Sequence, residues 1–434
     1  MKRIILLLLC TLSTCAPAWS QQSDGGLGLA QAQRMAVDGN HDLRLALAAV
    51  QAAQAAILAA DTAPNPVLTL QTVNINPSLG IGAGPLRGKT VDSSVRIDQQ
   101  IERGGKRALR IDNAQYLELA SRADLADVRR QLRLAVTQAY YDLLAAQEKR
   151  EIARDTAGLY GSSLEAARRR RKAGDLAGAD VSRIEVDALR AANDVDQADA
   201  ELQRAQQTLA LALGMPQDAP RLRATDPWPD LPAPGAEDDA ADIAGIEAAL
   251  DRRADVRAAK ARVGAAAAAL RLALALRTRD ITVSLQGEHW PQSAADAQGS
   301  GNSVGVAVQF PLFVRNQYQG EIRNAQAAAD SAAVTLEKTR AAALSDLARS
   351  ASDARVAASR RRRYESELLP ASARSADAAE YAFRNGAAGV MDVLDARRTR
   401  RATLLDAAIV RAEHAKALAA REAARAGATD NNDL

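Results

Sequence analysis

The sequence predicts a mostly α-helical fold with a small β part, organised as two internal repeats. Three observations lead to this fold class. The chain of 434 residues is 47% hydrophobic but only 3% aromatic, a composition that favours long, closely packed helices over one large compact core. Two stretches of alternating apolar and polar residues each run into a very long helical pattern. These stretches align with each other, Val95 with Val306 and Ile111 with Ile322, which indicates a repeat.

The N-terminal segment, residues 1–20, has the pattern of a secretory signal peptide. Two basic residues precede an apolar run from Ile4 to Leu12, and small residues precede a cleavage site after Ser20. The run is too short to cross a bilayer as a helix. The alternative is lipidation of Cys15, which follows the residues Leu-Ser-Thr. Cys10 lies in the same segment, so cleavage after Ser20 leaves no thiol for disulfides or thiolate metal sites.

The first repeat is expected over residues 21–214. It reads as a helix, two strands, a very long helix, a short break and a last helix, at residues 27–61, 67–76, 91–101, 106–173, 174–179 and 179–213. The long helix contains no proline. At ~1.5 Å per residue it would reach about 100 Å, which no globular domain of this mass can hold.

A linker at residues 215–239 leads to a second repeat at residues 240–426, and residues 427–434 are expected to form a disordered tail. The second repeat has the same order of elements, at residues 240–279, 281–289, 303–313, 317–385, 386–390 and 390–424. Pro370 aligns with Gly158, and both weaken helices, so we expect a bend there. In each repeat, two shorter helices placed end to end match the long helix in length. This predicts a layer of long parallel helices with the strands at one end.

The four strand segments have the length and alternation of strands that cross a bilayer. Each has about 9–11 residues, and apolar Val304, Val306 and Val308 alternate with small or polar residues. A half-buried strand in a soluble sheet has the same period. The export signal and the shortage of aromatic residues favour the membrane. Four strands leave unpaired edges in lipid, so more copies are needed. Three copies would give twelve strands, while two or four copies remain open.

Glycine and proline mark the two strand-to-helix junctions. Gly104 and Gly105 follow the second strand, and Pro311 lies at the end of the fourth. Glycine gives the backbone freedom to turn, and proline cannot continue a sheet ladder. We expect these residues to redirect the chain from the strands into the helices.

No residue pattern indicates catalysis, a cofactor or a metal site. The three histidines, His41, His289 and His414, lie far apart in the sequence and have no ligand spacing. Removing Lys2 and Arg3 with the signal lowers the formal net charge from +3 to +1, which gives no electrostatic footprint for nucleic acid.

The residues that carry a family resemblance are spread over both repeats. They are APNP at 63–66, GGKR at 104–107, PLF at 311–313 with RNQ at 315–317, GEI at 320–322 and YAFRNGAAGVMDVLDARRT at 381–399. In this order, on a duplicated helix–strand architecture, they resemble the TolC-type outer-membrane efflux proteins, in particular the heavy-metal (CzcC-like) branch.

The resemblance implies a homotrimer in the bacterial outer membrane. Each chain would contribute four strands to a twelve-stranded membrane β-barrel and long helical hairpins to a periplasmic α-barrel. Such a protein is a passive exit duct and not an enzyme. It works with a periplasmic adaptor and an inner-membrane pump of the resistance-nodulation-division type.

The resemblance also implies a periplasmic tip, formed by the two helix breaks, that contacts the adaptor. Its residues here are Gly174, Asp175, Leu176, Ala177, Gly386, Ala387, Ala388, Gly389 and Val390. Gly389 stands where the family often has Ser or a similar cap. Acidic rings near the aperture are another family feature, and Asp377 and Glu380 are the candidates; an ordinary solvated helix face is the alternative.

The cargo follows from the branch alone, which implies heavy-metal cations. Export of drugs or other organic compounds is an alternative within the family. A soluble periplasmic coiled-coil adaptor or scaffold is the alternative from another class, and it would not need four strands of bilayer length.

Overall fold

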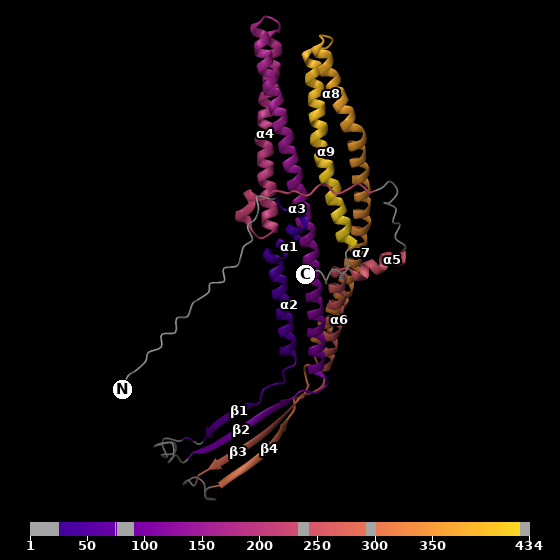
Figure 1. Ribbon diagram of the computed structural model, residues 1–434. Coiled ribbons are helices and arrows are strands. Elements are labelled where there is room, and N and C mark those ends of the chain that lie inside the picture. Colours follow the sequence, from indigo (N-terminus) through magenta and orange to yellow (C-terminus); the bar gives the residue numbers. More distant parts are fainter. Residues whose placement is uncertain (1–25, 74, 76–90, 233–242, 292–300, 426–434) are drawn as a thin grey trace, which may run out of the picture.

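The molecule is a bundle of long rods with a small sheet at one end (Figure 1). The computed structural model describes residues 26–73, 75, 91–232, 243–291 and 301–425. The expected signal peptide, the Gly/Pro-rich loop between the first two strands and the expected tail lie outside the described residues. In the described part, segments of the two repeats stand side by side along most of the height of the molecule.

The first repeat contains α1 (Leu29–Gly39), α2 (His41–Ala60), α3 (Lys106–Lys172) and α4 (Gly178–Ala212). The linker then begins with the short 3-10 helix η3 (Pro216–Arg221). The second repeat contains α5 (Ile243–Arg252), α6 (Ala254–Ala275), α7 (Gln319–Arg363), the π-helical turn η4 (Tyr364–Leu368), α8 (Leu369–Arg384) and α9 (Val390–Arg425). Figure 1 shows α2 and α4 placed one above the other along α3, so two short helices do match one long one.

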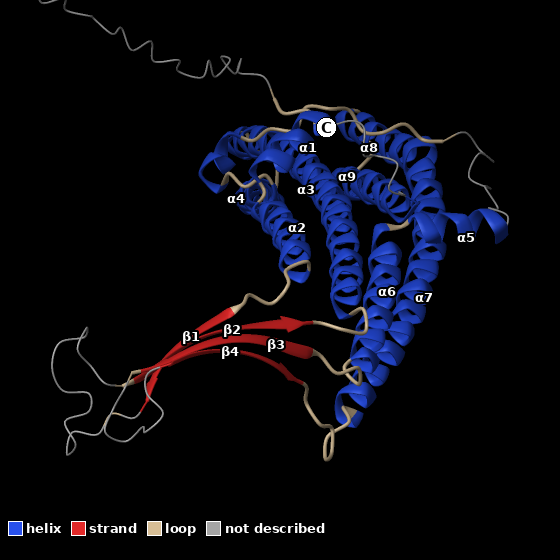
Figure 2. Cartoon of the chain, turned by 90° about the horizontal axis from the view of Figure 1, so that it is seen from below, coloured by secondary structure: helices blue, strands red, loops and turns tan. Residues whose placement is uncertain are grey.

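The four strands form one antiparallel sheet in the order β1 (Val67–Val73), β2 (Asp92–Ile101), β3 (Ile281–Trp290) and β4 (Gly301–Gln309). Short loops connect them to α2, α3, α6 and α7 (Figure 2). The register aligns an apolar row, Leu68, Ile97, Leu285 and Val306. The neighbouring row, Thr69, Arg96, Gln286 and Gly305, is small or polar and faces the other way. One face of the sheet is therefore apolar and the other polar.

The fourth strand differs from its predicted range, residues 303–313. It begins two residues earlier and ends at Gln309, before Pro311. Proline has no N–H to donate to a ladder, so the alternation that continues beyond it is extended chain without strand pairing.

The first helix of each repeat is broken, which corrects the single helices expected at residues 27–61 and 240–279. Asn40 separates α1 from α2, and its side-chain oxygen accepts hydrogen bonds from Asp42 N (2.9 Å) and Leu43 N (3.2 Å) as an N-cap. Arg253, with 2% of its surface exposed, separates α5 from α6 and pairs with Asp255 at 2.7 Å. Gly39-Asn40 is a local stop and start signal that the sequence already contains.

The helix α2 is long and apolar enough to cross a membrane by length and composition, with a mean hydropathy of 1.6 in its most apolar window. Its buried side chains, Leu43 and Val50, pack with Leu125 of α3, which sets α2 beside the long rod. Its other face leaves Leu45 and Leu58 69% and 73% exposed. A surface of this kind is available to a neighbouring chain.

The two long rods are built differently. The first, α3, is α-helical over 67 residues and passes through Gly158 without interruption. The second is divided by η4, where Leu369 N donates to the carbonyl of Tyr364, five residues back. Pro370, at the start of α8, cannot donate to the carbonyl four residues before it, and its ring would clash with that group. A π turn directly before the proline removes this conflict.

The largest core lies at the waist, which we define as the level where linker residues 222–232 cross the helices (Figure 1). Tyr140 of α3 is fully buried there; its hydroxyl donates to Leu27 O (2.9 Å) and accepts from Thr225 N (3.1 Å) and Asp226 N (2.9 Å). Trp228 stacks on Tyr141 and donates to Glu148 at 3.0 Å. The linker is therefore fastened across α3 by side-chain contacts.

Candidate functional site

Both helix breaks at the far end from the sheet are closed by the same backbone motif. Gly174, with φ of +87°, lets Asp175 N reach Arg170 O at 2.9 Å and its own N–H reach Arg171 O at 3.0 Å. Gly386, with φ of +72°, does the same through Ala387 N to Ala382 O (2.8 Å) and its N–H to Phe383 O (3.1 Å). These are Schellman motifs, which need a residue free to adopt positive φ. We call residues 173–178 and 385–390 the two tip turns.

The helices that leave the tip turns start differently. Asp392, the third residue of α9, reaches back to accept from Gly389 N at 2.9 Å. The carboxylate thus forms half of a capping box on a glycine that has no side chain of its own. Asp180, at the matching place in α4, contacts Arg183 at 3.3 Å instead. The capping at Gly389 is therefore supplied from within α9 by Asp392, a residue that the sequence analysis did not single out.

The tip turns expose most of their residues but share an apolar contact. Leu176 and Val390 are partly buried and pack against a cluster that includes Val181, Ile184 and Leu394. Gly174, Asp175, Ala177, Gly386, Ala387 and Gly389 are exposed, and Ala388 is partly buried. The structure thus brings the sequence-predicted tip residues of both hairpins to one end of the molecule, as Figure 1 shows at its top.

The two acidic candidates lie on α8 and are paired within the chain. Asp377 contacts Arg400 of α9 at 3.2 Å, and its side chain is 73% exposed. Glu380 contacts Arg397 at 2.9 Å and, more weakly, Arg384 at 3.5 Å. The exposed pair of Asp377 with Arg400 contributes little to stability, about 0–1 kcal/mol. Their arginine partners reduce the negative potential that the carboxylates alone would create.

Arginines of α9 tie the second hairpin to the first, which the sequence analysis did not identify. Arg398 donates to both carboxylate oxygens of Asp187 at 2.8 and 2.7 Å, and Asp187 is only 5% exposed. Arg401 contacts Asp194 at 2.5 Å. Arg397 donates to Ser163 of α3 at 2.9 Å. The run Arg-Arg-Thr-Arg-Arg at 397–401 was the available signal, because such a run puts basic side chains on more than one helix face.

The first strand-to-helix junction combines two left-handed glycines with a buried lysine. Gly104 and Gly105 have φ of +75° and +68°, and Gly105 is the N-cap of α3. A Cβ on Gly104 would lie 2.8 Å from the side chain of Thr278. Lys106, 6% exposed, donates to Thr278 O and to Asp280, both at 2.8 Å. Through Lys106, the GGKR segment therefore holds the start of α3 against the residues just before β3.

The second junction is longer and is built without glycine. Pro311 lies in the irregular segment 310–318, and Tyr318, with φ of +62°, is the N-cap of α7. Among the described residues it is the only non-glycine with positive φ. A tyrosine in this backbone region is held there by its surroundings.

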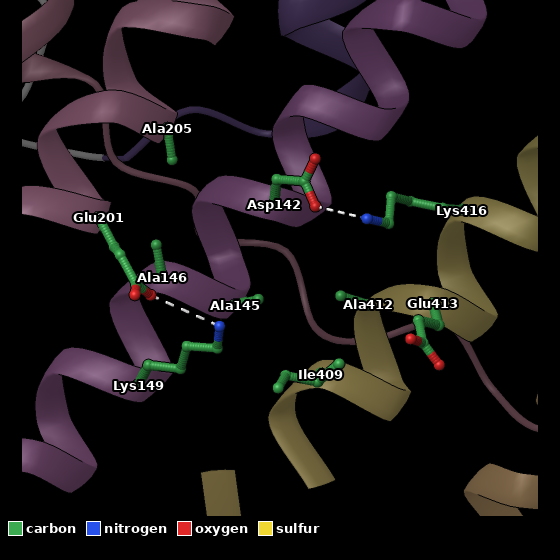
Figure 3. A pocket seen from close by; sticks show the side chains of 10 residues that line it. All are labelled: Asp142, Ala145, Ala146, Lys149, Glu201, Ala205, Ile409, Ala412, Glu413 and Lys416. Atoms are coloured by element: carbon green, nitrogen blue, oxygen red, sulfur yellow. Dashed lines mark hydrogen bonds and ion pairs between the residues drawn. The ribbon is translucent and has the colours of Figure 1, made fainter. Parts of the chain in front are cut away.

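A shallow groove of about 330 Å³ lies between α3, α4 and α9 (Figure 3). Alanines form its floor, and ion pairs cross it from Asp142 to Lys416 (2.7 Å) and from Lys149 to Glu201 (3.5 Å). Its lining residues are Asp142, Ala145, Ala146, Lys149, Glu201, Ala205, Ile409, Ala412, Glu413 and Lys416. Because these charges satisfy one another, the groove is a seam between hairpins.

Histidines and carboxylates do not gather into a metal-binding group within the described ranges. His414 is fully buried in α9 at the waist, and its Nδ1 lies 3.2 Å from Arg361. Burial, helped by the charge of Arg361, lowers the pKa of His414 to about 4. His289 pairs with Asn302 across two strands at 2.7 Å.

Comparison with known proteins identifies the family. The chain matches the outer membrane efflux protein family over residues 33–215 and 245–427, which correspond to the two repeats. It is 27% identical to the cobalt-zinc-cadmium resistance protein CzcC of Cupriavidus metallidurans, over 90% of this chain and 87% of that protein.

Solved structures have the same fold. The outer-membrane channel OprN is 26% identical, with a TM-score of 0.74 over 92% of this chain and 90% of that one. CusC is 19% identical, with a TM-score of 0.72 over 92% of each chain. The duplicated match, the four-stranded sheet and the paired long hairpins lead to one conclusion: this chain is a member of the outer membrane efflux protein family.

Proposed function

We propose that this protein is the outer-membrane exit channel of a tripartite efflux system and that its cargo is heavy-metal cations. The observation that carries the cargo is the similarity to a cobalt-zinc-cadmium resistance protein along nearly the whole chain. The chain acts as a passive duct, and the energy for transport comes from its partners. It has no role as an enzyme.

The working assembly is a homotrimer. Among the described residues, β1 and β4 each have one edge without a partner strand in the four-stranded sheet. In lipid these N–H and C=O groups must be paired, and three copies would close twelve strands into a barrel. The exposed Leu45 and Leu58 of α2 suit the same role, because they give the rods an apolar face for a neighbouring copy.

The partners are a periplasmic adaptor and an inner-membrane pump of the resistance-nodulation-division type. We assign the adaptor contact to the exposed parts of the tip turns, at Gly174–Ala177 and Gly386–Val390. Their Schellman motifs give the two turns one shape, and their small residues allow close approach of a partner helix. Deleting residues 386–390 should abolish resistance while trimers still form; loss of the trimer would instead make this turn a structural element.

The carboxylates Asp377 and Glu380 are proposed to form part of the aperture. In a trimer they would repeat three times around the channel axis and would attract cations. Asp377→Asn removes the charge that faces Arg400, and it should change the cation preference or raise the resting conductance of single channels. Unchanged channels would make Asp377 a residue of a solvated helix face.

Growth of a deletion strain is the test of the cargo. Without this gene product, cells should become sensitive to cobalt, zinc or cadmium, and the full-length chain supplied in trans should restore growth. A panel of organic compounds serves as the comparison. Sensitivity to organic compounds with unchanged metal tolerance would overturn the metal assignment and favour drug export.

A further inference from the structure

An exposed apolar stripe continues beyond the end of the sheet. Along β4 the exposed apolar side chains are the even-numbered Val304, Val306 and Val308, and the same alternation continues through Phe310, Leu312 and Val314. Leu312 and Val314 are 65% and 83% exposed, although β4 ends at Gln309. An apolar stripe of this length, on a sheet placed in the outer membrane, reaches to the end of the hydrocarbon layer.

Aromatic residues collect where this stripe ends. The chain has only three Phe residues, and two of them, Phe310 and Phe313, lie in the segment between β4 and α7. The rings of Phe313 and Tyr318 meet in a T-shaped contact with their centroids 5.3 Å apart, and the guanidinium of Arg279 lies over the Phe313 ring at 5.6 Å from its centroid. Tyr318 is the residue held at positive φ. Tyr318, whose backbone is strained, therefore belongs to an aromatic cluster at the height where aromatic side chains border a membrane.

Basic side chains at the same level outnumber their acidic partners. Three are paired, in the contacts Lys106–Asp280, Arg107–Asp61 and Arg110–Glu102. Four more arginines have no carboxylate within ion-pair distance among the described residues; these are Arg103, Arg277, Arg279 and Arg315. Each chain therefore carries these four arginines in the band where the strands meet the helices.

The segments that carry these arginines contact one another. Arg103 N donates to Asp280 at 2.9 Å, which places it next to Arg279. Arg277 donates to Gln317 O at 3.3 Å, which joins the turn before β3 to the segment before α7. Arg315 follows directly on Val314, the last exposed apolar residue of the stripe. The positive band thus begins where the apolar stripe ends.

We propose that Arg277, Arg279 and Arg315, with Phe313 and Tyr318, form a binding site for the headgroup of an anionic phospholipid in the leaflet nearest the helices. The acyl chains lie along Leu312 and Val314, and the arginines hold the phosphate, for which the planar guanidinium is well suited. A soluble acidic partner would leave the apolar part of this surface in water, so the combination of charge and stripe favours a lipid. The inference rests on the insertion of the sheet in the outer membrane.

The site is tested by lipid retention of the purified full-length protein in detergent. The protein is equilibrated with equal amounts of phosphatidylglycerol and phosphatidylcholine of the same acyl chains, and native mass spectrometry counts the lipids that remain bound. The wild type should retain phosphatidylglycerol preferentially. The Arg279→Gln/Arg315→Gln variant should lose this preference by a factor on the order of 25, since one arginine near an anionic surface contributes about fivefold. Arg349→Gln, on an exposed part of α7, is the matched control and should behave as the wild type.

Four further outcomes decide the proposal. Arg279→Lys keeps the charge but loses the planar contact with Phe313, so an intermediate preference is expected. An unchanged preference in the double variant, with normal recovery from outer-membrane fractions, would overturn the headgroup site alone. Failure of the wild type to enter the outer membrane would overturn both the site and the channel function. Displacement of the lipid by millimolar inorganic phosphate would also overturn the lipid-headgroup site, because the site would then bind a soluble anion.

Discussion

This outer-membrane efflux protein has two helical hairpins, α3 with α4 and α7–η4–α8 with α9. Their turns are alike, but their long helices differ in the middle. Both tip turns are Schellman motifs closed by a glycine at positive φ. Between sheet and tip, however, α3 is one helix of 67 residues, whereas the second rod is interrupted by the π turn η4. The duplication has therefore kept the turn chemistry and changed the rod.

A single extra residue accounts for the interruption. The repeats align at a spacing of 211 residues near the sheet, as in Val95 and Val306, but at 212 near the tip, as in Gly174 and Gly386. One residue has thus been added to the second rod between these levels. A π turn is the usual way for a helix to absorb one residue without rotating the part that follows.

The two hairpins differ at the position of His414, close to η4. Glu365 in η4 accepts from Arg361 at 2.9 Å and from Arg411 at 3.0 Å, beside the buried His414. The residue that aligns with His414 in the first hairpin is Leu202, which packs against the waist core. At this one position the second hairpin therefore holds a buried titratable side chain where the first holds an apolar one.

Deleting one residue should affect the two rods unequally, and this is the largest effect that we expect. Removing the exposed Asp155 from α3 rotates the tipward part by one residue, which takes the buried Tyr160 and Ala167 off their cluster. The loss should be at least about 3–5 kcal/mol, comparable to removing a buried aromatic side chain. Deleting Ser366 together with Pro370→Ala should restore a plain α-helix at little cost. Thermal unfolding followed by circular dichroism measures both, and equal losses would remove the distinction between the rods.

Acid should weaken the second hairpin through His414. Its pKa is about 4 in the folded protein and about 6.5 when unfolded. Above pH 6.5 both states are neutral, so this part of the stability is fully present. Between pH 6.5 and 4 the unfolded state binds the proton first, and stability falls by about 2–3 kcal/mol.

His414→Leu copies the residue of the first hairpin and isolates this effect. Unfolding midpoints at pH 7.5 and 4.5 give the pH dependence of each protein, and carboxylate titration is common to both. The variant should lose less stability on acidification than the wild type. The same acid sensitivity in both proteins would assign it to other groups.

Glu365→Gln should cost about 1.5–2 kcal/mol, because it weakens two charge-assisted hydrogen bonds and leaves the guanidinium of Arg361, which is 7% exposed, without an anion. Asp199→Asn is the matched change in the first hairpin, where Arg150 and Asp199 are each 35% exposed. That change should cost at most about 1 kcal/mol. Urea unfolding of both variants gives the difference, and a larger loss at Asp199 would reverse the comparison.

The smallest difference should be found at the tip turns. Gly174→Ala and Gly386→Ala each place a Cβ in open space but at positive φ, so each should cost about 1–2 kcal/mol from backbone strain alone. The two losses in thermal stability should agree within about 0.5 kcal/mol. Unequal losses would indicate that the two turns are not equivalent. Gly158→Ala, in the middle of α3 with room for a Cβ, is the control and should stabilise by about 0.5–1 kcal/mol.

Much of the fold followed from short-range patterns in the sequence. Alternation revealed the strands, a proline-free pattern revealed α3, and Gly174 and Gly386 marked the tip turns, because each of these signals depends on neighbours within a few residues. The change of spacing from 211 to 212 also held the information for the π turn. The break at Asn40 was readable as well, since its capping bonds are local.

Only the tertiary structure decided which distant side chains meet. Arg398 and Asp187 are 211 residues apart in the chain, and the buried Arg361 meets Pro229 O and His414 across segments 132 and 53 residues distant. Periodicity places a side chain on a helix face, but the partner of that face is fixed by how the rods pack side by side. The sequence by itself determined the rods, the strands and their turns, and packing determined the ion pairs that join one hairpin to the other.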